Sequence, residues 1–409
     1  MRYYLIAFAL LLAPTLQAQN ISGSWTGLLD AGPVQLHITF NIQKDTNGHD
    51  ICLMDSPDQS VKGIQTQLNH ISKDSLNIAI PIIGATYQGK LSDKTINGTF
   101  TQMGRKFTLN LKNEILKYKR PQHPVAPYSY TTQEVKFCNK NAGVTLSGTL
   151  TYPVGYKQGD RVPVVLMVSG SGPQNRDSEI FEHKPFLVIA DYLAKNGIAT
   201  LRYDDRAVGK STGKQQAPTT KEVAEDAQAG IEFLQGQPFF SKVGILGHSE
   251  GATVAFMLGA QQSPDFIICL ASLGVKGDDC LYAQAKKITE LSGHPMNISK
   301  EQYVEMALSK PNPWLRHFFD YDPETDIKRT TCPVFALNGD KDCQVIAAQN
   351  LTSIEKKLPK NMKSKVKLYH GLNHLFQECT TGLPQEYISI EQTISPTVLK
   401  DIADWIGTL

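Results

Sequence analysis

The chain has 409 residues, which is enough for two domains or for one large domain. Apolar residues make up 41% and charged residues 20% of the chain, an ordinary globular composition that excludes wholesale disorder. The net charge is +2 and no stripe of Lys and Arg stands out, so charge gives no basis for binding nucleic acid.

The first residues have the pattern of a secretory signal peptide. Arg2 precedes an apolar run from Tyr3 to Ala13, and the small residue Ala18 offers a cleavage site. We therefore expect residues 1–18 to be removed and the protein to be exported, to the periplasm or the extracellular space. The apolar run is shorter than the roughly 20 residues that span a bilayer, which argues against a stable membrane span. The alternative is a buried N-terminal strand or helix.

The seven cysteines do not form a recognisable framework. Their odd number leaves at least one unpaired in a monomer, and no CxxC or metal-ligand spacing occurs. We expect most of them to be small core residues and expect no metal site.

Residues 19–115 predict a small all-β, barrel-like domain. Short alternating segments are separated by turns rich in Gly, Asn and Asp, as in antiparallel barrels and sandwiches. The clearest segments are 34–42, 76–83, 95–102 and 106–111. Nothing in this part assembles a catalytic set. Residues 116–131, with three prolines, predict an extended linker.

From residue 132 to residue 409 the pattern predicts a second domain of the α/β class. A hairpin (134–138 and 144–152) is followed by apolar strands that alternate with amphipathic helices, which indicates a mostly parallel central sheet covered on both faces. The expected strands are 162–168, 198–203, 243–246, 266–271, 334–337 and 366–369, and the expected helices are 186–196, 222–235, 251 onward, 347–358 and 397–406. Between about 273 and 331 the alternation stops, and helical stretches (281–291 and 300–309) predict an insertion placed as a lid over the carboxyl ends of the strands.

The strongest chemical signal is Gly247-His248-Ser249-Glu250-Gly251. It fits G-x-S-x-G, a tight strand-to-helix turn that exposes a nucleophilic serine, and here a buried strand precedes it and a helix follows. The glycines leave room for the turn, and the helix N-terminus adds positive potential beside Ser249. We expect His248 to point away from the site. The alternative is a glycine-rich turn with a capping serine.

A serine needs a base, and in this arrangement an acid and then a histidine follow it along the chain. Asp340 and Asp342 both follow the strand 334–337, and we favour Asp342 as the acid, with Asp340 as a turn former. Of the two later histidines, His370 still belongs to a strand end. His374 lies in the loop beyond it and is our expected base.

A developing oxyanion needs two donors. One is expected to be the backbone N–H of Glu250, and the other the N–H of Ser171, with Gly172 as the alternative, in the small-residue loop after 162–168. Nearby, Asp204, Asp205 and Arg206 are expected to pair with one another and to brace the loop, and direct contact with the substrate is the alternative.

The motifs as a set resemble the bacterial carboxylesterases of the α/β-hydrolase superfamily, the serine aminopeptidase (S33-like) group. The resemblance is carried by residues 168–177, 202–211, 247–251, 338–345 and 371–376, and more weakly by 25–27, 55–59 and 98–102 in the N-terminal β-rich part. It implies an α/β-hydrolase fold and a carboxylic ester hydrolase that cleaves small-molecule, short-chain acyl esters through an acyl-enzyme, with no metal or organic cofactor. Ala207 and Ala252 stand where that group commonly has glycine.

Other functions remain as alternatives. A peptidase of the same fold would need to hold a charged terminus, for which Glu290, Glu301 and Glu305 are candidates that we expect to be solvated. A non-catalytic binding protein is disfavoured because no triad member is missing. A β domain that places or gates an active hydrolase stays an open alternative. The aromatic residues of the insertion either line an apolar acyl site or hold the insertion to the core; they include Trp314, Phe318 and Phe319.

Overall fold

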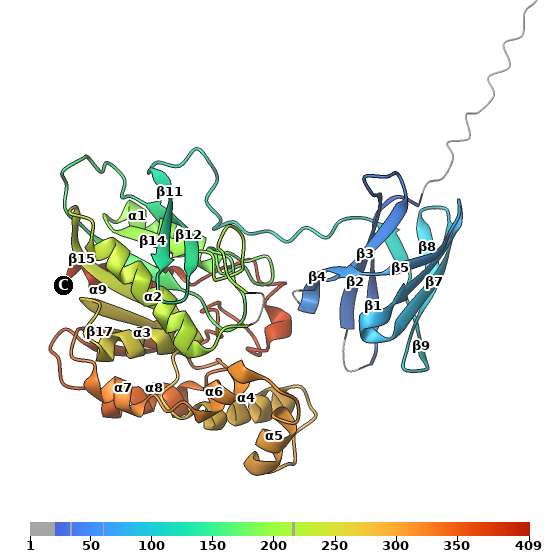
Figure 1. Ribbon diagram of the computed structural model, residues 1–409. Helices are drawn as coiled ribbons and strands as arrows, with labels where there is room; N and C mark the ends of the chain where they lie inside the picture. The colour runs from blue at the N-terminus through green and yellow to red at the C-terminus, as the bar shows by residue number, and fades with distance from the viewer. Residues whose placement is uncertain (1–20, 33–34, 60, 215–216) are drawn as a thin grey trace, which may run out of the picture. The chain divides into compact units, whose positions relative to one another are not determined.

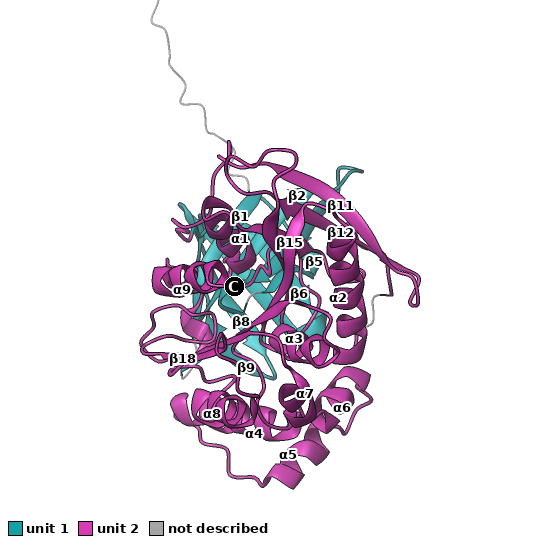
Figure 2. Ribbon diagram, turned by 90° about the vertical axis from the view of Figure 1, so that its left-hand side faces the viewer, with its two compact units in different colours: residues 1–117 teal, residues 118–409 magenta. Residues whose placement is uncertain are grey.

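A computed structural model describes residues 21–409 except 33–34, 60 and 215–216. The expected signal peptide, residues 1–18, lies outside the described residues. The chain divides into two compact units, residues 1–117 (unit 1) and residues 118–409 (unit 2) (Figure 2). No helix in the described part of the chain is long and apolar enough to cross a membrane.

Unit 1 is one antiparallel sheet that is nearly closed on itself. Its strand order is β4-β3-β2-β1-β10-β8-β7-β6-β5, with β9 paired to β8. The two edge strands, β4 and β5, follow each other along the chain with only Thr66 between them, so the sheet must curl to bring its edges together. The strands are β1 (Gly23–Asp30), β2 (Gln35–Lys44), β3 (Asp50–Ser56), β4 (Val61–Gln65), β5 (Gln67–Ile71), β6 (Ser75–Ile80), β7 (Ala85–Ser92), β8 (Thr95–Gln102), β9 (Arg105–Thr108) and β10 (Leu111–Asn113).

The alternation of side chains in unit 1 produces its core. In β6, Leu76, Ile78 and Ile80 are buried while the residues between them are partly exposed, as the two-residue period of a strand requires. The strand expected at 106–111 is two strands in the structure, β9 and β10, and 81–83 is a short 3-10 turn rather than the end of a strand. Pro81 has no N–H to give to a ladder, which explains why β6 stops at Ile80.

Most of the predicted linker, 116–131, makes specific contacts with unit 2. From residue 118 it belongs to unit 2. The guanidinium of Arg120 donates to the backbone oxygens of Phe181, Ile388 and Ile390 at 2.9, 2.7 and 3.1 Å, and Gln122 donates to the oxygen of Ile394. These bonds satisfy loop carbonyls of unit 2, so the proline-rich stretch serves as an extended strap and not as a free tether.

Unit 2 has an eight-stranded sheet in the order β11-β12-β14-β13-β15-β16-β17-β18. Neighbours from β14 through β18 run parallel, and the hairpin β11–β12 is antiparallel at one edge. The strands are β11 (Thr132–Asn139), β12 (Val144–Thr151), β13 (Val162–Val168), β14 (Ala199–Tyr203), β15 (Phe240–His248), β16 (Phe266–Leu270), β17 (Val334–Gly339) and β18 (Lys365–Tyr369). Every residue of β14, β16 and β17 is buried, because both faces of the sheet are covered.

Helices cover the two faces, and successive strand residues alternate between them. On one face α1 (Pro185–Lys195) and α9 (Pro396–Gly407) pack with Leu246 and Ile268, among others. On the other, α2 (Thr220–Gln235), α3 (Glu250–Ala260) and α8 (Ala347–Lys357) pack with Ile245 and Ile267. Figure 2 shows α1 and α9 on one side of β15, with α2 and α3 on the other.

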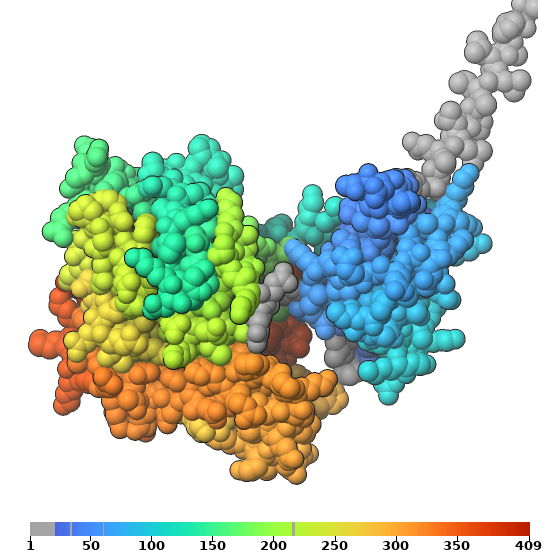
Figure 3. Space-filling view, in the orientation of Figure 1, coloured from blue at the N-terminus to red at the C-terminus, as the bar shows by residue number. Residues whose placement is uncertain are grey.

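Between β16 and β17, where every residue is described, the chain forms four helices. They are α4 (Gly277–Leu291), α5 (Lys300–Ala307), α6 (Pro313–Asp320) and α7 (Glu324–Arg329). Figures 1 and 3 show this segment as a continuous layer along one side of unit 2. The sequence analysis missed α6 and α7, although Asn312 followed by Pro313 is a helix-start signal: the Asn312 side chain accepts the N–H of Leu315 at 3.0 Å.

Candidate active site

Ser249 lies on strained backbone between β15 and α3. Its φ of 56° and ψ of −120° fall outside the regions that residues with a side chain normally adopt. The Ser249 N–H donates to the oxygen of Leu270 at 2.8 Å, which ties the turn to the neighbouring strand β16. The turn therefore presents the serine side chain at the carboxyl edge of the sheet.

Close packing explains the glycines around the turn. A Cβ atom at Gly247 would lie 2.0 Å from the backbone oxygen of Gly251, and one at Gly251 would lie 2.2 Å from the backbone oxygen of Val168. A Cβ atom at Gly170, in the loop after β13, would lie 3.2 Å from the Cβ of Ser249. Any side chain at Gly247 or Gly251 would force backbone apart, so the turn can exist only with glycine at these two positions.

Asp342 and His374 meet in the interior of the same edge. Asp342 follows β17 and His374 follows β18, and the Nδ1 of His374 lies 2.7 Å from the Oδ2 of Asp342. Both residues are buried, with 3% and 4% of their surface exposed. The other carboxylate oxygen, Oδ1, accepts the N–H groups of Gln344 and Val345 at 2.8 and 2.9 Å, which fixes the plane of the carboxylate.

The neighbouring pair, Asp340 and His370, lies apart from this arrangement. Asp340 accepts from the Nδ1 of His370 at 2.9 Å and from the Gly371 N–H at 2.7 Å, and the His370 side chain is 86% exposed. Neither residue is among those that line the cavity described below. The structure thus sorts the four candidates into one buried pair, whose histidine lines the same cavity as Ser249, and one exposed pair that closes a turn.

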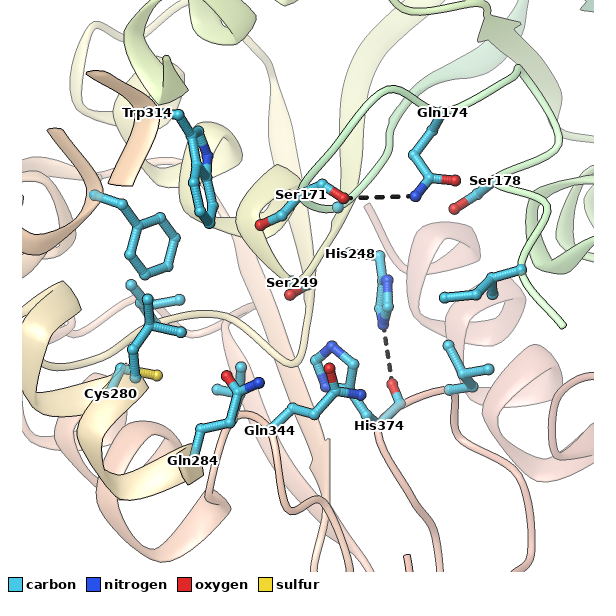
Figure 4. A pocket seen from close by; sticks show the side chains of 17 residues that line it. Ser171, Gln174, Ser178, His248, Ser249, Cys280, Gln284, Trp314, Gln344 and His374 are labelled. Carbon is cyan, nitrogen blue, oxygen red and sulfur yellow. Dashed lines mark hydrogen bonds between the residues drawn. The ribbon is translucent and has the colours of Figure 1, made fainter. Parts of the chain in front are cut away.

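The expectation that His248 points away from the site was wrong. Its ring lines the cavity, 4.7 Å from the ring of His374, and its Nε2 lies 2.9 Å from the backbone oxygen of His374 (Figure 4). Burial, together with the charge of a protonated His374, lowers the pKa of His248 to about 3. The ring is therefore neutral at neutral pH and donates through Nε2, which holds the His374 loop in place.

The loop after β13 approaches Ser249 closely. Gly170 and Ser171 line the cavity, whereas Gly172, at a φ of 88°, is not among the lining residues of the described chain. The N–H of Glu250 is the first of α3 and has no carbonyl partner within the helix. The loop after β13 and the start of α3 therefore both adjoin Ser249, and the assignment of the Ser171 and Glu250 N–H groups to an oxyanion site remains a prediction.

Asp205 anchors that loop. It accepts the hydroxyl of Ser169 at 3.1 Å and the N–H of Gln174 at 2.8 Å. Burial raises the pKa of Asp205 to about 7; those hydrogen bonds lower it, and the nearby charges of Asp226 and Glu250 raise it further. The loop that carries Ser171 is therefore held by a carboxyl group that titrates near neutral pH.

The other charges of this region brace the loop through partners that the sequence analysis did not assign. Instead of pairing with one another, Asp204 pairs with Arg176 at 2.8 Å and Arg206 with Asp226 at 2.7 Å. Arg202 pairs with Asp177. The braces connect β14 to the loop after β13 and to α2, two elements that are distant along the chain.

A cavity of about 200 Å³ contains Ser249 and His374. Helices α4 and α6 supply Cys280, Leu281, Gln284, Trp314 and Phe318 to its wall, while the loops supply Ser171, Gln174, Ser178 and Gln344. Figure 4 shows Trp314 and Cys280 on one side of Ser249, with Gln174 and Ser178 on the other. Among the described residues that line it, none is Asp, Glu, Lys or Arg.

Two contributions to the site were missed or left open by the sequence analysis. The Glu250 side chain is buried and accepts a hydrogen bond from Trp314, although only its backbone was assigned a role. Trp314 and Phe318 line the cavity, whereas Phe319 is buried and is not among the lining residues.

Glu290, Glu301 and Glu305 are exposed on the insertion and away from the cavity wall. No group of His, Cys, Asp and Glu in the described chain is arranged to hold a metal ion.

Residues 184–330 match the family model described as serine aminopeptidase, S33. The matched region includes the turn at Ser249 and the four helices before β17, and it ends before Asp342. The chain is also 28% identical over 273 residues to esterase EstD of Thermotoga maritima. Over residues 184–330, unit 2 is thus similar to the family described as serine aminopeptidase, S33. The aligned region covers 64% of this chain and 65% of EstD, just under two thirds of the length of that relative.

Solved structures with a similar arrangement include esterases and a peptidase. Est1E of Butyrivibrio proteoclasticus with bound ferulic acid is 16% identical, with a TM-score of 0.48 over 67% of this chain and 98% of its own. The Pyrococcus furiosus esterase Pf2001 is 16% identical, with a TM-score of 0.47 over 72% of this chain and 99% of its own. The proline iminopeptidase of Mycobacterium smegmatis is 12% identical, with a TM-score of 0.46 over 68% of this chain and 98% of its own.

Proposed function

We propose that the protein hydrolyses carboxylic esters through an acyl-enzyme on Ser249. The observation that carries the proposal is the buried pair of His374 and Asp342, 2.7 Å apart, whose histidine lines the same cavity as Ser249. The carboxylate accepts a hydrogen bond from the Nδ1–H of the imidazole, which leaves Nε2 without a proton and able to take one from a serine hydroxyl. The relationship to S33-like hydrolases and to esterase EstD supports the same chemistry.

The reaction follows in two halves. Ser249 Oγ attacks the ester carbonyl carbon while His374 Nε2 takes its proton, and the N–H groups of Glu250 and Ser171 hold the resulting oxyanion. The bond to the alcohol oxygen then breaks, and His374 returns the proton to that oxygen. In the second half a water molecule, deprotonated by His374, attacks the acyl-serine and releases the carboxylic acid.

The cavity favours small, uncharged esters. Ligand pockets commonly measure roughly 300–1,000 Å³, and this cavity of about 200 Å³ is below that range. A peptidase that trims a charged terminus needs an opposite charge in its wall, and the described lining residues include no Asp, Glu, Lys or Arg. We therefore place short-chain acyl esters before aminoacyl amides, with helices α4 and α6 acting as the lid that limits the space.

We also propose that the protein is exported to the periplasm or the extracellular space, on the sequence pattern of residues 1–18 alone. Edman or mass-spectrometric determination of the N-terminus of the natural protein tests this. A mature chain that begins after Ala18 supports export, and a chain that retains Met1 or Arg2 contradicts it.

The decisive experiment is hydrolysis of p-nitrophenyl esters, from acetate to decanoate, by the full chain and by Ser249→Ala. We expect turnover that is greatest for the shortest acyl groups, and a loss of at least about 10⁴-fold in kcat for the variant. Equal turnover by the folded variant would exclude Ser249 as the nucleophile. Absence of ester turnover by the wild type, together with hydrolysis of aminoacyl amides, would favour a peptidase.

A further inference from the structure

Glu250 is a buried carboxylate that the reaction described above does not use. Only 3% of its surface is exposed, and its backbone alone has been given a role. Its Oε1 accepts the hydroxyl of Thr220 at 2.5 Å, and both of its carboxylate oxygens lie 3.0 Å from the indole Nε1 of Trp314. Burying a carboxylate without hydrogen-bond donors costs free energy. The hydroxyl of Thr220 and the indole N–H of Trp314 therefore have to stay beside Glu250.

The hydrogen bond fixes a residue of the inserted helices against the catalytic turn. Trp314 is the second residue of α6 and lies 64 positions from Glu250 along the chain. Its ring packs against Phe318, with ring centroids 5.4 Å apart, and both rings line the cavity. The indole is thus held by an apolar contact within α6 and by a polar contact to the residue after Ser249.

The chemistry of the proposed reaction decides which part of the substrate meets Trp314. His374 must return a proton to the departing alcohol, so the alcohol lies on the His374 side of Ser249. The acyl group then extends to the opposite side. Figure 4 places Trp314 across Ser249 from His374, so the indole stands where the acyl group ends.

We propose that Glu250 is a positioning residue whose side chain holds Trp314 as the end wall of the acyl site. This inference rests on the proposed ester hydrolysis and adds to it the element that limits acyl length. One residue then sets two features of the site, because its N–H faces the oxyanion while its carboxylate fixes the wall. Esters with short, unbranched acyl groups are the substrate class that this arrangement selects.

The Glu250 side chain does not itself line the described cavity, which makes a clean test possible. We would compare Glu250→Gln, which keeps an acceptor oxygen for the indole, with Glu250→Leu, which has a similar size and no acceptor. The measured quantity is the ratio of kcat/KM for p-nitrophenyl octanoate to that for the acetate, in the full chain. The ratio should stay near the wild-type value for Glu250→Gln and rise at least about tenfold for Glu250→Leu, because a few methylene groups change selectivity by that order.

Trp314→Ala and the double variant Glu250→Leu/Trp314→Ala complete a double-mutant cycle. Trp314→Ala should raise the ratio at least as far as Glu250→Leu does, and the double variant should raise it no further. A general loss of stability would lower both rate constants together and leave the ratio unchanged. Independent, additive changes in the ratio, or an unchanged ratio in Glu250→Leu with a wild-type melting temperature, would overturn the inference while leaving the proposed function intact.

A second measurement does not depend on turnover. The indole emission of Glu250→Leu, compared with the wild type, should shift to longer wavelength as Trp314 loses its partner, and that of Glu250→Gln should not. If the wild type cleaves no ester, the proposed function fails. An unshifted emission spectrum in Glu250→Leu would then show that the carboxylate does not hold the indole, and a shifted one would preserve the positioning role without the substrate assignment.

Discussion

The two units differ in what they bury. In the described part of unit 1 the buried polar side chains are hydroxyl groups, those of Thr26, Thr39 and Ser56, and no ionisable side chain except the thiol of Cys52 and the phenol of Tyr87 is buried. Unit 2 buries carboxylates, guanidinium groups and imidazoles, mostly toward the carboxyl edge of its sheet; they include Arg202, Asp204, Asp226, Glu250, Asp342 and His374.

This difference separates a unit stabilised by apolar packing from a unit that also buries ionisable groups. Burying an ionised group costs free energy unless partners compensate it, so a fold concentrates such groups only where they are held by specific contacts. In unit 2 two of the buried carboxylates, Asp342 and Glu250, hold His374 and Trp314, which line the cavity. In unit 1 the sheet encloses a core of Ile, Leu, Phe and Trp side chains. The comparison can be tested by removing buried and exposed charges of unit 2 and an exposed charge of unit 1.

The largest effect is expected for Asp342→Asn. The amide is uncharged and does not accept the hydrogen bond of the His374 Nδ1–H as the carboxylate does, so the imidazole loses its orientation and the stabilisation of its charged form. The kcat for ester hydrolysis should therefore fall about 10⁴-fold. Asp340→Asn is the matched control, since it changes the same group two residues away in the exposed pair. Similar losses in both variants would contradict the assignment of Asp342 as the acid.

A second test compares ion pairs of the two units. Asp204→Ala removes one partner of a pair whose side chains are 15% and 6% exposed, and should cost unit 2 about 3 kcal/mol of stability. Asp50→Ala breaks the Lys44–Asp50 pair of unit 1, whose side chains are 62% and 32% exposed, and should cost less than about 1 kcal/mol. Hydrogen exchange assigns the loss to each unit. Equal costs would show that burial does not distinguish the two pairs.

A smaller effect concerns pH. The pKa of Asp205 is raised from 3.8 to about 7, so between these values the folded chain retains a proton that the unfolded chain has released. Stability should therefore fall as pH rises through this window and should not recover above it. Asp205→Asn stays neutral and can still accept from Ser169 and Gln174. Urea denaturation at about pH 5 and about pH 8 should show a smaller fall for the variant than for the wild type; parallel pH profiles would refute this.

The smallest effect is expected from removing unit 1. The described residues that line the cavity all belong to unit 2, and a compact unit with its own core can fold alone. A chain of residues 118–409 should therefore cleave p-nitrophenyl acetate with a kcat comparable to that of the full chain. Loss of turnover in a chain whose circular dichroism shows it folded would break the comparison, because unit 1 would then gate the site.

Local patterns predicted much of this molecule. The strands 95–102 and 162–168 have the expected bounds, and the turn at Ser249 lies between a strand and a helix as its motif indicated. These features depend on residues close together in the sequence. The departure noted at Ala207 also has a local meaning, because its φ of 62° is a backbone conformation that glycine adopts at lower cost.

Contacts between distant residues could not be predicted in the same way. The pairing of Arg176 with Asp204 and of Glu250 with Trp314 depends on how loops and inserted helices pack, and no spacing in the sequence encodes those distances. His248 was misjudged for this reason: its neighbour in space is the His374 loop, which lies 126 residues later. Asp342 and His374, which the sequence favoured as acid and base, form the buried pair, and Asp340 and His370 form the exposed one. The catalytic roles of Asp342 and His374 remain predictions.

The thiol of Cys280 has a consequence for chemical probes. It lines the cavity, and burial together with the negative charge of Asp342 raises its pKa to about 12. The thiolate is the form that reacts with alkylating reagents, and little of it is present at such a pKa. Iodoacetamide should therefore modify Cys280 slowly, even though this side chain lines the cavity. A fluorophosphonate, which phosphonylates an activated serine with loss of fluoride, should then label Ser249 without competition from Cys280, and covalent inhibitors aimed at this cavity are better directed at the serine oxygen than at this thiol.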